Sequence, residues 1–194
     1  MLKWQFTAFL ALYLIFSTNF SLRAAEAESS LKSPGQFTLS VNGALLLGGE
    51  INRDNFIFKS GYSFFIQPAY EYSNFSIFLH TGVFLLEDEG FLPIGAGLRY
   101  YTGNKPSGFH FSFSAGFADA WLRDRTNERY SLDGRWFAMP GFGYRLLISE
   151  NLKGIFGLNV LHQNAVLRFE HPQSESISSV INFTFLKFSL GVEF

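Results

Sequence analysis

The sequence predicts an all-β fold, an eight-stranded antiparallel up-and-down transmembrane β-barrel, and three observations support it. Apolar residues alternate with small or polar ones over eight runs, which is the period of half-buried strands. Phenylalanine accounts for 25 of the 194 residues and charged residues for only 16 %, whereas soluble domains carry about 25 %. Tight and longer connections alternate along the chain, as they do between the two rims of such a barrel.

The first four runs span 37–47, 61–70, 75–85 and 92–100, and each has one face of large apolar side chains. Those side chains are Phe37, Leu39, Val41, Leu45 and Leu47; Tyr62, Phe64, Ile66, Pro68 and Tyr70; Phe75, Ile77, Leu79, Val83 and Leu85; and Leu92, Ile94, Ala96, Leu98 and Tyr100. The opposite faces are mostly Gly, Ala, Ser and Thr, and in the third run Phe78 and Phe84 are large exceptions.

The last four runs span 109–118, 136–146, 153–160 and 187–194. Their large apolar side chains are Phe109, Phe111, Phe113 and Phe117; Trp136, Pro140, Phe142, Tyr144 and Leu146; Phe156, Leu158 and Val160; and Phe188, Leu190, Val192 and Phe194. The fifth run alternates most regularly, because Ser, Gly, Ala and a histidine separate its phenylalanines. We therefore expect eight strands with the same two-sided character.

The connections predict two different rims. Tight turns are expected at 72–74, 103–107 and 149–151, after the second, fourth and sixth runs. Longer polar loops are expected at 48–58, 119–133 and 170–176, and a short acidic connection at 87–90. An up-and-down barrel places such alternate connections at opposite ends.

Residues 1–27 have the pattern of a secretory signal peptide. Lys3 supplies the positive charge, residues 6–20 are mainly apolar, and Ala25-Glu26-Ala27 fits a cleavage site, with 22–24 as a rival. We expect residues 28–194 to form the exported barrel domain.

The charges indicate which face contacts lipid. The mid-strand charges all share the small-residue face: Glu71, Arg99, Arg145, Lys153, Lys187 and Glu193. A lysine or arginine on the lipid side costs about 2–4 kcal/mol at mid-depth, and the lumen of eight strands has room only for packed side chains. We expect the aromatic face to be too bulky for the lumen and to face lipid, with tyrosines and tryptophans, Tyr100 and Tyr101 among them, near the strand ends. A soluble lipocalin-like binder of apolar ligands, with the faces reversed, is the alternative.

In its eight alternating runs and its pattern of connections, the chain resembles the small eight-stranded outer-membrane barrels of Gram-negative bacteria, of the OmpA/OmpX type. The resemblance is most specific at residues 187–194, where a polar residue precedes alternating hydrophobics and a final aromatic. It implies insertion into the cell outer membrane, among lipid and lipopolysaccharide, by the barrel-assembly machinery. The implied assembly signal is Lys187, Leu190, Val192 and Phe194, and Ser189 departs from the pattern, which prefers glycine there.

The small-residue face also predicts a lumen polar network of Glu71, His80, Arg99, His110, Arg145 and Lys153. Buried polar groups need partners, and eight strands leave no aqueous channel. We interpret the network as a plug rather than as a proton or ion path.

The segment His162-Gln163-Asn164-Ala165 resembles the His-x-Ser-Asn segment of the lipid A deacylase (PagL-like) barrels, which use a lipid-facing His-Ser-Glu triad. His162 shares the parity of Phe156 and would face lipid. Asn164 stands where the resemblance requires the nucleophilic serine, and an amide cannot attack an ester. Glu175 is the candidate orienting carboxylate, and the substitute hydroxyls are Ser176, Ser178 and Ser179.

Several other functions are excluded or unsupported. The chain has no cysteine and a net charge of −1, which excludes thiolate sites and a basic nucleic-acid surface. No metal-ligand spacing or nucleotide fingerprint occurs, so no cofactor is expected. Surface arginines that could contact an extracellular ligand are Arg123, Arg125 and Arg129. We expect a non-enzymatic, monomeric barrel with a structural, adhesive or surface-interaction role; an esterase using His162 is the alternative.

Overall fold

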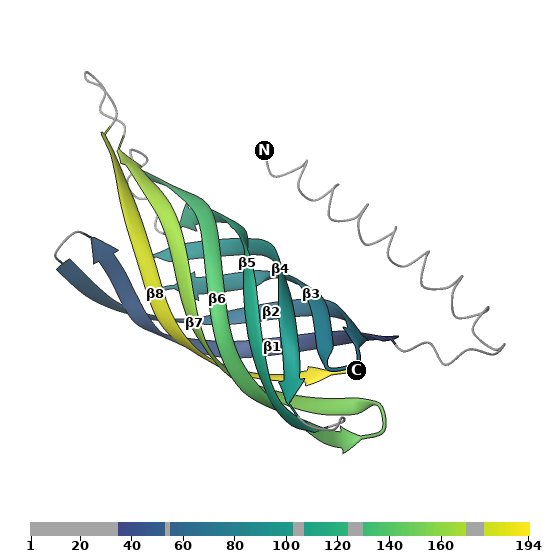
Figure 1. Ribbon diagram of the computed structural model, residues 1–194. Helices are drawn as coiled ribbons and strands as arrows, with labels where there is room; N and C mark the ends of the chain where they lie inside the picture. The colour runs from purple at the N-terminus through teal and green to yellow at the C-terminus, as the bar shows by residue number, and fades with distance from the viewer. Residues whose placement is uncertain (1–34, 53–54, 103–106, 124–129, 170–176) are drawn as a thin grey trace. The chain divides into compact units, whose positions relative to one another are not determined.

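The computed structural model describes residues 35–52, 55–102, 107–123, 130–169 and 177–194, which form one closed ring of eight strands (Figure 1). The strands are β1 (Gly35–Asn52), β2 (Asn55–Tyr72), β3 (Phe75–Leu86), β4 (Glu89–Thr102), β5 (Gly108–Leu122), β6 (Tyr130–Ser149), β7 (Leu152–Phe169) and β8 (Ile177–Glu193). Each strand pairs antiparallel with the next, and β1 also pairs with β8, so the predicted fold class is confirmed. The predicted signal peptide, 1–27, lies outside the described residues. Within those residues, no helix is long and apolar enough to cross a membrane.

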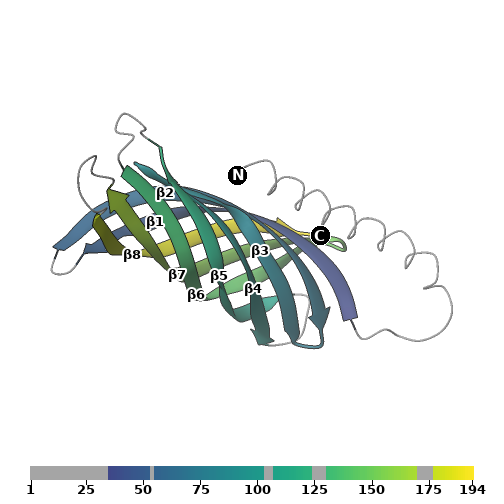
Figure 2. The same ribbon diagram turned by 90° about the horizontal axis from the view of Figure 1, so that it is seen from above.

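The register shows how strongly the strands slant, as Figure 2 also shows. One row of paired residues runs round the ring through Gly35, Tyr72, Phe75, Tyr100, Phe111, Phe142, Leu158, Phe188 and Leu45. The row starts on β1 at Gly35 and returns at Leu45, a stagger of ten residues. A stagger of this size requires strands tilted by roughly 40°. Apart from the starting glycine, every residue in the row is aromatic or leucine.

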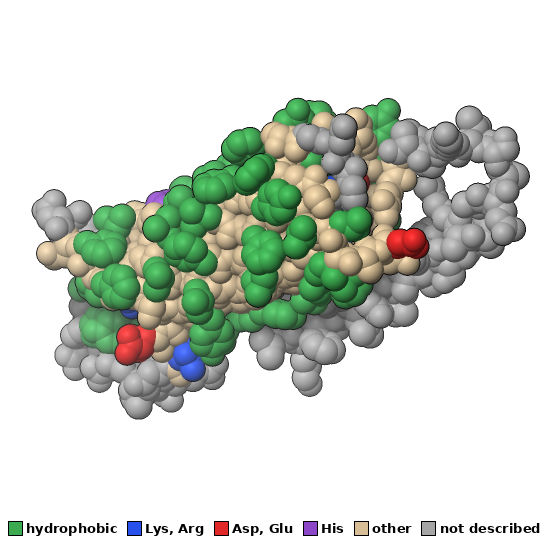
Figure 3. All heavy atoms as spheres, turned by 90° about the horizontal axis from the view of Figure 1, so that it is seen from below, with side chains coloured by type: hydrophobic (Ala, Val, Ile, Leu, Met, Phe, Trp, Pro, Cys, Tyr) green, Lys and Arg blue, Asp and Glu red, His purple; other side chains and the backbone are tan. Residues whose placement is uncertain are grey.

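Large apolar side chains cover the outside of the barrel (Figure 3). Phe117 is 72 % exposed, Leu45 63 % and Phe109 61 %. On the face drawn in Figure 3, the charged side chains of the described residues lie near the two ends. A water-soluble monomer rarely exposes so large a continuous apolar surface. This arrangement is the reverse of what the lipocalin-like alternative requires.

The two rims differ. We call the rim that holds both ends of the described barrel and the connections β2–β3, β4–β5 and β6–β7 the turn rim. The opposite rim is the loop rim. Its predicted polar loop at 48–58 is wrong, because β1 continues to Asn52 and β2 begins at Asn55. Likewise, strands occupy much of the predicted loop at 119–133: β5 ends at Leu122 and β6 begins at Tyr130. The predicted loop 170–176 lies outside the described residues.

An apolar layer fills the lumen toward the loop rim. It contains Phe65, Phe84, Phe91, Phe137, Phe183 and Phe185, each at most 1 % exposed. The expectation that aromatic rings are too bulky for the lumen is therefore wrong in this layer. Glycines make the room: a Cβ on Gly95 would lie 2.8 Å from the Phe137 ring, and one on Gly82 2.7 Å from the Phe65 ring. Toward the turn rim the lumen is polar instead.

Candidate functional site

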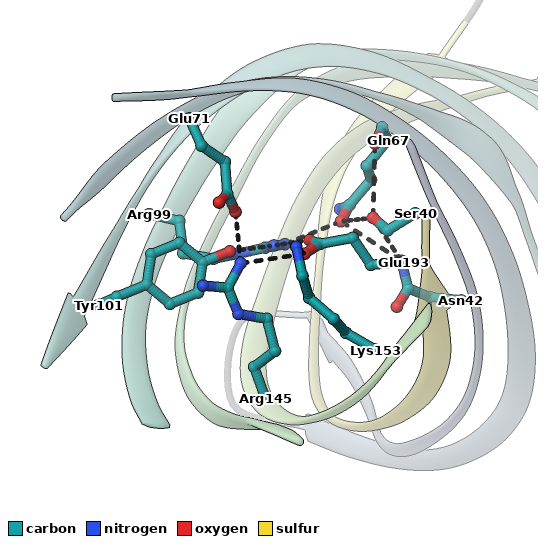
Figure 4. Close-up of polar contacts among 9 residues, drawn as sticks. All are labelled: Ser40, Asn42, Gln67, Glu71, Arg99, Tyr101, Arg145, Lys153 and Glu193. Atoms are coloured by element: carbon teal, nitrogen blue, oxygen red, sulfur yellow. Dashed lines mark hydrogen bonds and ion pairs between the residues drawn. The ribbon is translucent and has the colours of Figure 1, made fainter. Parts of the chain in front are cut away.

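The polar layer of the lumen is organised around Glu193 of β8, which is 1 % exposed (Figure 4). Its carboxylate lies 3.0 Å from Arg145 Nη1, 3.1 Å from Lys153 Nζ and 3.5 Å from Arg99 Nη1. Arg145 Nη1 also lies 2.5 Å from Glu71 Oε1. We call these five residues the ion cluster. Their mutual pairing satisfies charges that would be costly to bury alone.

Five strands supply the ion cluster, one side chain each from β2, β4, β6, β7 and β8. Lys153 and Glu193 are paired residues of neighbouring strands, so their side chains leave the sheet side by side. The others meet across the lumen, which a narrow barrel allows because its opposite walls are close. The cluster therefore ties together strands far apart in the sequence.

Neutral side chains extend the ion cluster. The guanidinium of Arg145 lies 3.8 Å from the centroid of the Tyr101 ring, and Arg99 donates to Tyr101 Oη at 3.2 Å. Arg99 also donates to Gln67 Oε1 at 3.1 Å. Tyr101 is 2 % exposed, so its expected place among the strand-end aromatics outside is wrong.

The two lumen histidines lie beside the cluster and not within it. His80 Nδ1 lies 2.8 Å from Gln67 Nε2, and its ring lies 4.2 Å from that of Phe65. His110 meets Tyr101 edge-on, with ring centroids 5.7 Å apart. All six residues predicted to line the lumen are buried there. The alternation of residues along each strand predicted which of these side chains face the lumen. It did not predict that Glu193 is the centre of the ion cluster, or that Tyr101 and Gln67 contact it.

A second ionic group lies at the loop rim. Lys59 of β2 contacts Glu89 of β4, lies 3.7 Å from Glu50 of β1 and reaches Asp88 at 4.0 Å. Arg123, a predicted surface contact, donates to the carbonyl of Leu86 at 3.0 Å. Arg125 and Arg129 lie outside the described residues. The apolar layer thus separates two ionic groups.

His162 lies on the outward face of β7, paired with Thr184 of β8. Its Nδ1 is 3.0 Å from Thr184 Oγ1, and its ring centroid is 5.1 Å from that of Trp136. Asn164 donates to Asn182 Oδ1 at 2.8 Å. Below this point the outward residues of β7 and β8 are apolar, namely Phe156, Leu158, Val160, Leu186, Phe188 and Leu190. The polar residues His162, Asn164, Asn182 and Thr184 thus adjoin this apolar stretch on its loop-rim side.

Two of the three expected substitute hydroxyls, those of Ser178 and Ser179, do not lie near His162. Ser178 and Ser179 pair with Arg168 and Leu167, and five or six residues along a strand amount to about 17–20 Å. Ser176 and Glu175 lie outside the described residues. The hydroxyl that the register brings to His162 is Thr184, which sequence reasoning missed because strand pairing was not known.

The predicted assembly segment divides between the two faces of β8. Leu190 and Phe194 are 60 % and 57 % exposed and lie outside with Val192, whereas Lys187 is 2 % exposed in the lumen. The backbone of Phe194 pairs with that of Leu39 in β1, with N–O distances of 3.0 and 3.1 Å. Within the described part of the chain, no group of three or more potential metal ligands occurs.

Comparison with known proteins supports the fold. No family model and no curated protein matches the sequence. Two similar solved structures are Neisserial surface protein A and the outer-membrane protein AlkL in lipid bilayers. The first has a TM-score of 0.56 at 12 % identity, covering 82 % of this chain and 97 % of that one. The second has a TM-score of 0.55 at 15 % identity, covering 87 % and 93 %. The resemblance to small outer-membrane barrels is therefore confirmed at the level of the fold.

Proposed function

We propose that the chain is an integral outer-membrane protein, exported through a cleaved signal peptide, with a surface-interaction role and no catalytic activity. The observation that carries this proposal is the combination of an apolar outer face with a filled lumen. The apolar face suits lipid. The packed aromatic layer and the ion cluster occupy the narrow lumen, which supports a role other than solute passage.

The loop rim is the part of this barrel suited to recognition. The β1–β2 hairpin carries exposed apolar side chains up to its tip, among them Ile51, Phe56 and Phe58, which are 41 %, 60 % and 66 % exposed. On β7 and β8, in contrast, polar residues such as His162 and Thr184 interrupt the apolar outer face well before the strands end. The proposal therefore places contacts with lipopolysaccharide or an extracellular ligand at this rim of a monomer. It also assigns assembly to the β8 segment of Leu190, Val192 and Phe194.

Cell fractionation tests the proposal. We expect the protein in the outer-membrane fraction and a different migration of unheated and boiled samples on SDS gels, because a closed barrel resists unfolding by detergent. Recovery as a soluble periplasmic protein would contradict it. A variant with Leu45, Phe109 and Phe117 all changed to Ser is the matched control. It alters only side chains of the outer face, and we expect it not to insert into the membrane.

A second candidate function, ester hydrolysis at the membrane boundary, is favoured by one observation. The hydrogen bond between His162 and Thr184 joins a general base to a hydroxyl on the lipid-facing side. No carboxylate among the described residues bonds to the His162 ring, which a triad would need for orientation. This function therefore ranks behind the first.

Fatty-acid release from lipopolysaccharide by purified protein separates the two candidates. The non-catalytic proposal expects no release above background from the wild type. Release that disappears in both His162→Asn and Thr184→Val, and persists in Thr102→Val, would establish the esterase instead. Thr102 is a suitable control because its hydroxyl bonds to the carbonyl of Phe109 at the opposite rim, 3.2 Å away.

A further inference from the structure

Lys187 of β8 is a buried lysine without a carboxylate partner. It is 2 % exposed, and its Nζ lies 3.6 Å from Met139 Sδ and 3.8 Å from the centroid of the Phe65 ring. Throughout the described strands and turns, no Asp or Glu forms an ion pair with it. A thioether is only a weak acceptor. The positive charge is therefore poorly compensated by protein groups.

A cavity of about 30 Å³ lies beside Lys187, between the apolar layer and the ion cluster. Its polar lining includes Lys187, Arg99, His110, Asn42, Gln67 and Asn159, and no carboxylate lines it. Arg99 Nε and His110 Nδ1 have no hydrogen-bond partner within the described part of the barrel. One water needs about 10–15 Å³, so the cavity has room for a small ion together with a water molecule.

The charges of the polar layer do not balance. Four cationic side chains, Arg99, Arg145, Lys153 and Lys187, accompany two carboxylates, Glu71 and Glu193. Both carboxylates already pair with other cations of the ion cluster. An uncompensated buried charge is strongly unfavourable, so Lys187 either loses its proton or gains a counter-ion. A small anion beside Lys187 would supply the missing negative charge.

We propose that the lumen cavity binds one small monovalent anion of the size of chloride, with Lys187 and Arg99 as its cationic contacts. The amide groups of Gln67 and Asn159 also line the cavity and supply further donors. The site is distinct from the surface-interaction role and does not depend on it. Its confined volume selects against bulky organic anions.

Thermal unfolding of the full-length protein in detergent tests the proposal. The folded fraction at each temperature is measured from the gel shift between folded and unfolded forms. Chloride and gluconate are compared at equal ionic strength. Once chloride exceeds its Kd, each tenfold rise should raise the wild-type midpoint by about 3–6 °C, and gluconate should not. In Lys187→Met, which removes the unpaired charge and keeps the apolar stem, the difference between the salts should disappear.

Lys153→Met is the matched control, because this lumen lysine pairs with Glu193 at 3.1 Å. It should lower the midpoint in both salts and keep the dependence on chloride. Equal wild-type midpoints in the two salts, or a chloride effect that survives in Lys187→Met, would overturn the proposal. Crystals grown in bromide give an independent result: anomalous density in the cavity beside Lys187 supports it, and its absence there contradicts it.

Discussion

Arg145 shows how one side chain connects distant parts of this barrel. Its guanidinium lies between Glu71 and Glu193 and stacks on Tyr101. Removing one partner of a buried ionic group costs about 3–5 kcal/mol, because the remaining charges lose their compensation. We expect Arg145→Met to lower the free energy of unfolding by that amount, measured by urea titration in detergent micelles.

Arg168→Met is the control for that prediction. Arg168 lies 2.8 Å from Asp133, but both side chains are about half exposed. Exposed pairs contribute about 0–1 kcal/mol, so this variant should unfold close to the wild type. A similar decrease in the free energy of unfolding in both variants would show that burial does not determine how much these ion pairs stabilise the barrel.

At the residue scale, parity predicted which charges enter the lumen but not how they pair. Glu71, Arg99, Arg145 and Lys153 all lie where alternation placed them. The choice of Glu193 as their centre depends on how the strands are staggered, which no local pattern contains. The same holds for His162, whose outward position follows from parity, whereas its bond to Thr184 follows from the β7–β8 register.

At the element scale, the β2–β3 turn contains a backbone conformation that its sequence does not favour. Ser73 has a φ of 52° and is the first of two residues that connect the paired Tyr72 and Phe75. Glycine is preferred at such a position because it has no Cβ to clash. Ser73→Gly should raise the free energy of unfolding by about 0.5–1 kcal/mol and Ser73→Val should lower it by about 1 kcal/mol, measured by urea titration.

Glu150→Gly provides the comparison at the same rim. Glu150 and Asn151 connect the paired Ser149 and Leu152, and among the described non-glycine residues only Ser73 has a positive φ. Glycine there should destabilise slightly, because it adds freedom to the unfolded chain without relieving strain. A gain in stability at Glu150 equal to that at Ser73 would contradict the interpretation.

The strands were predicted best where large apolar residues alternate regularly with small ones. They were predicted worst near the loop rim, where this alternation changes. Toward the ends of β7 and β8 the pattern changes, since the buried Asn164 and the paired Asn182 have the parity of the outer face while Phe183 and Phe185 fill the lumen. In β6, an irregular register between Gly134 and Phe137 interrupts the alternation. In β1 and β2, glycines and charged residues led to the wrong prediction of a loop at 48–58. Glu50 and Lys59 instead form an ion pair between the two paired strands. These features depend on how the strands pack against one another, and the alternation of residues in the sequence contains no information on that packing.

At the scale of the whole molecule, the chain separates its charges into two layers. The polar layer toward the turn rim carries an excess of cations, whereas three carboxylates, those of Glu50, Asp88 and Glu89, surround Lys59 at the loop rim. The apolar layer of phenylalanines lies between them. A barrel filled in this way gains rigidity from its interior and leaves its rims for interactions. In the proposed outer-membrane protein, the direction in which the barrel crosses the membrane therefore decides which rim meets the outside.

The proposed direction places the loop rim outside the cell, and the absence of cysteine makes it directly testable. Glu87 is exposed between β3 and β4 at the loop rim, and Glu150 is exposed between β6 and β7 at the turn rim. We expect Glu87→Cys to react with a membrane-impermeant maleimide on intact cells. Glu150→Cys should react only after the outer membrane is permeabilised, and the cysteine-free wild type measures the background. Labelling of Glu150→Cys alone on intact cells would reverse the direction and assign recognition to the turn rim.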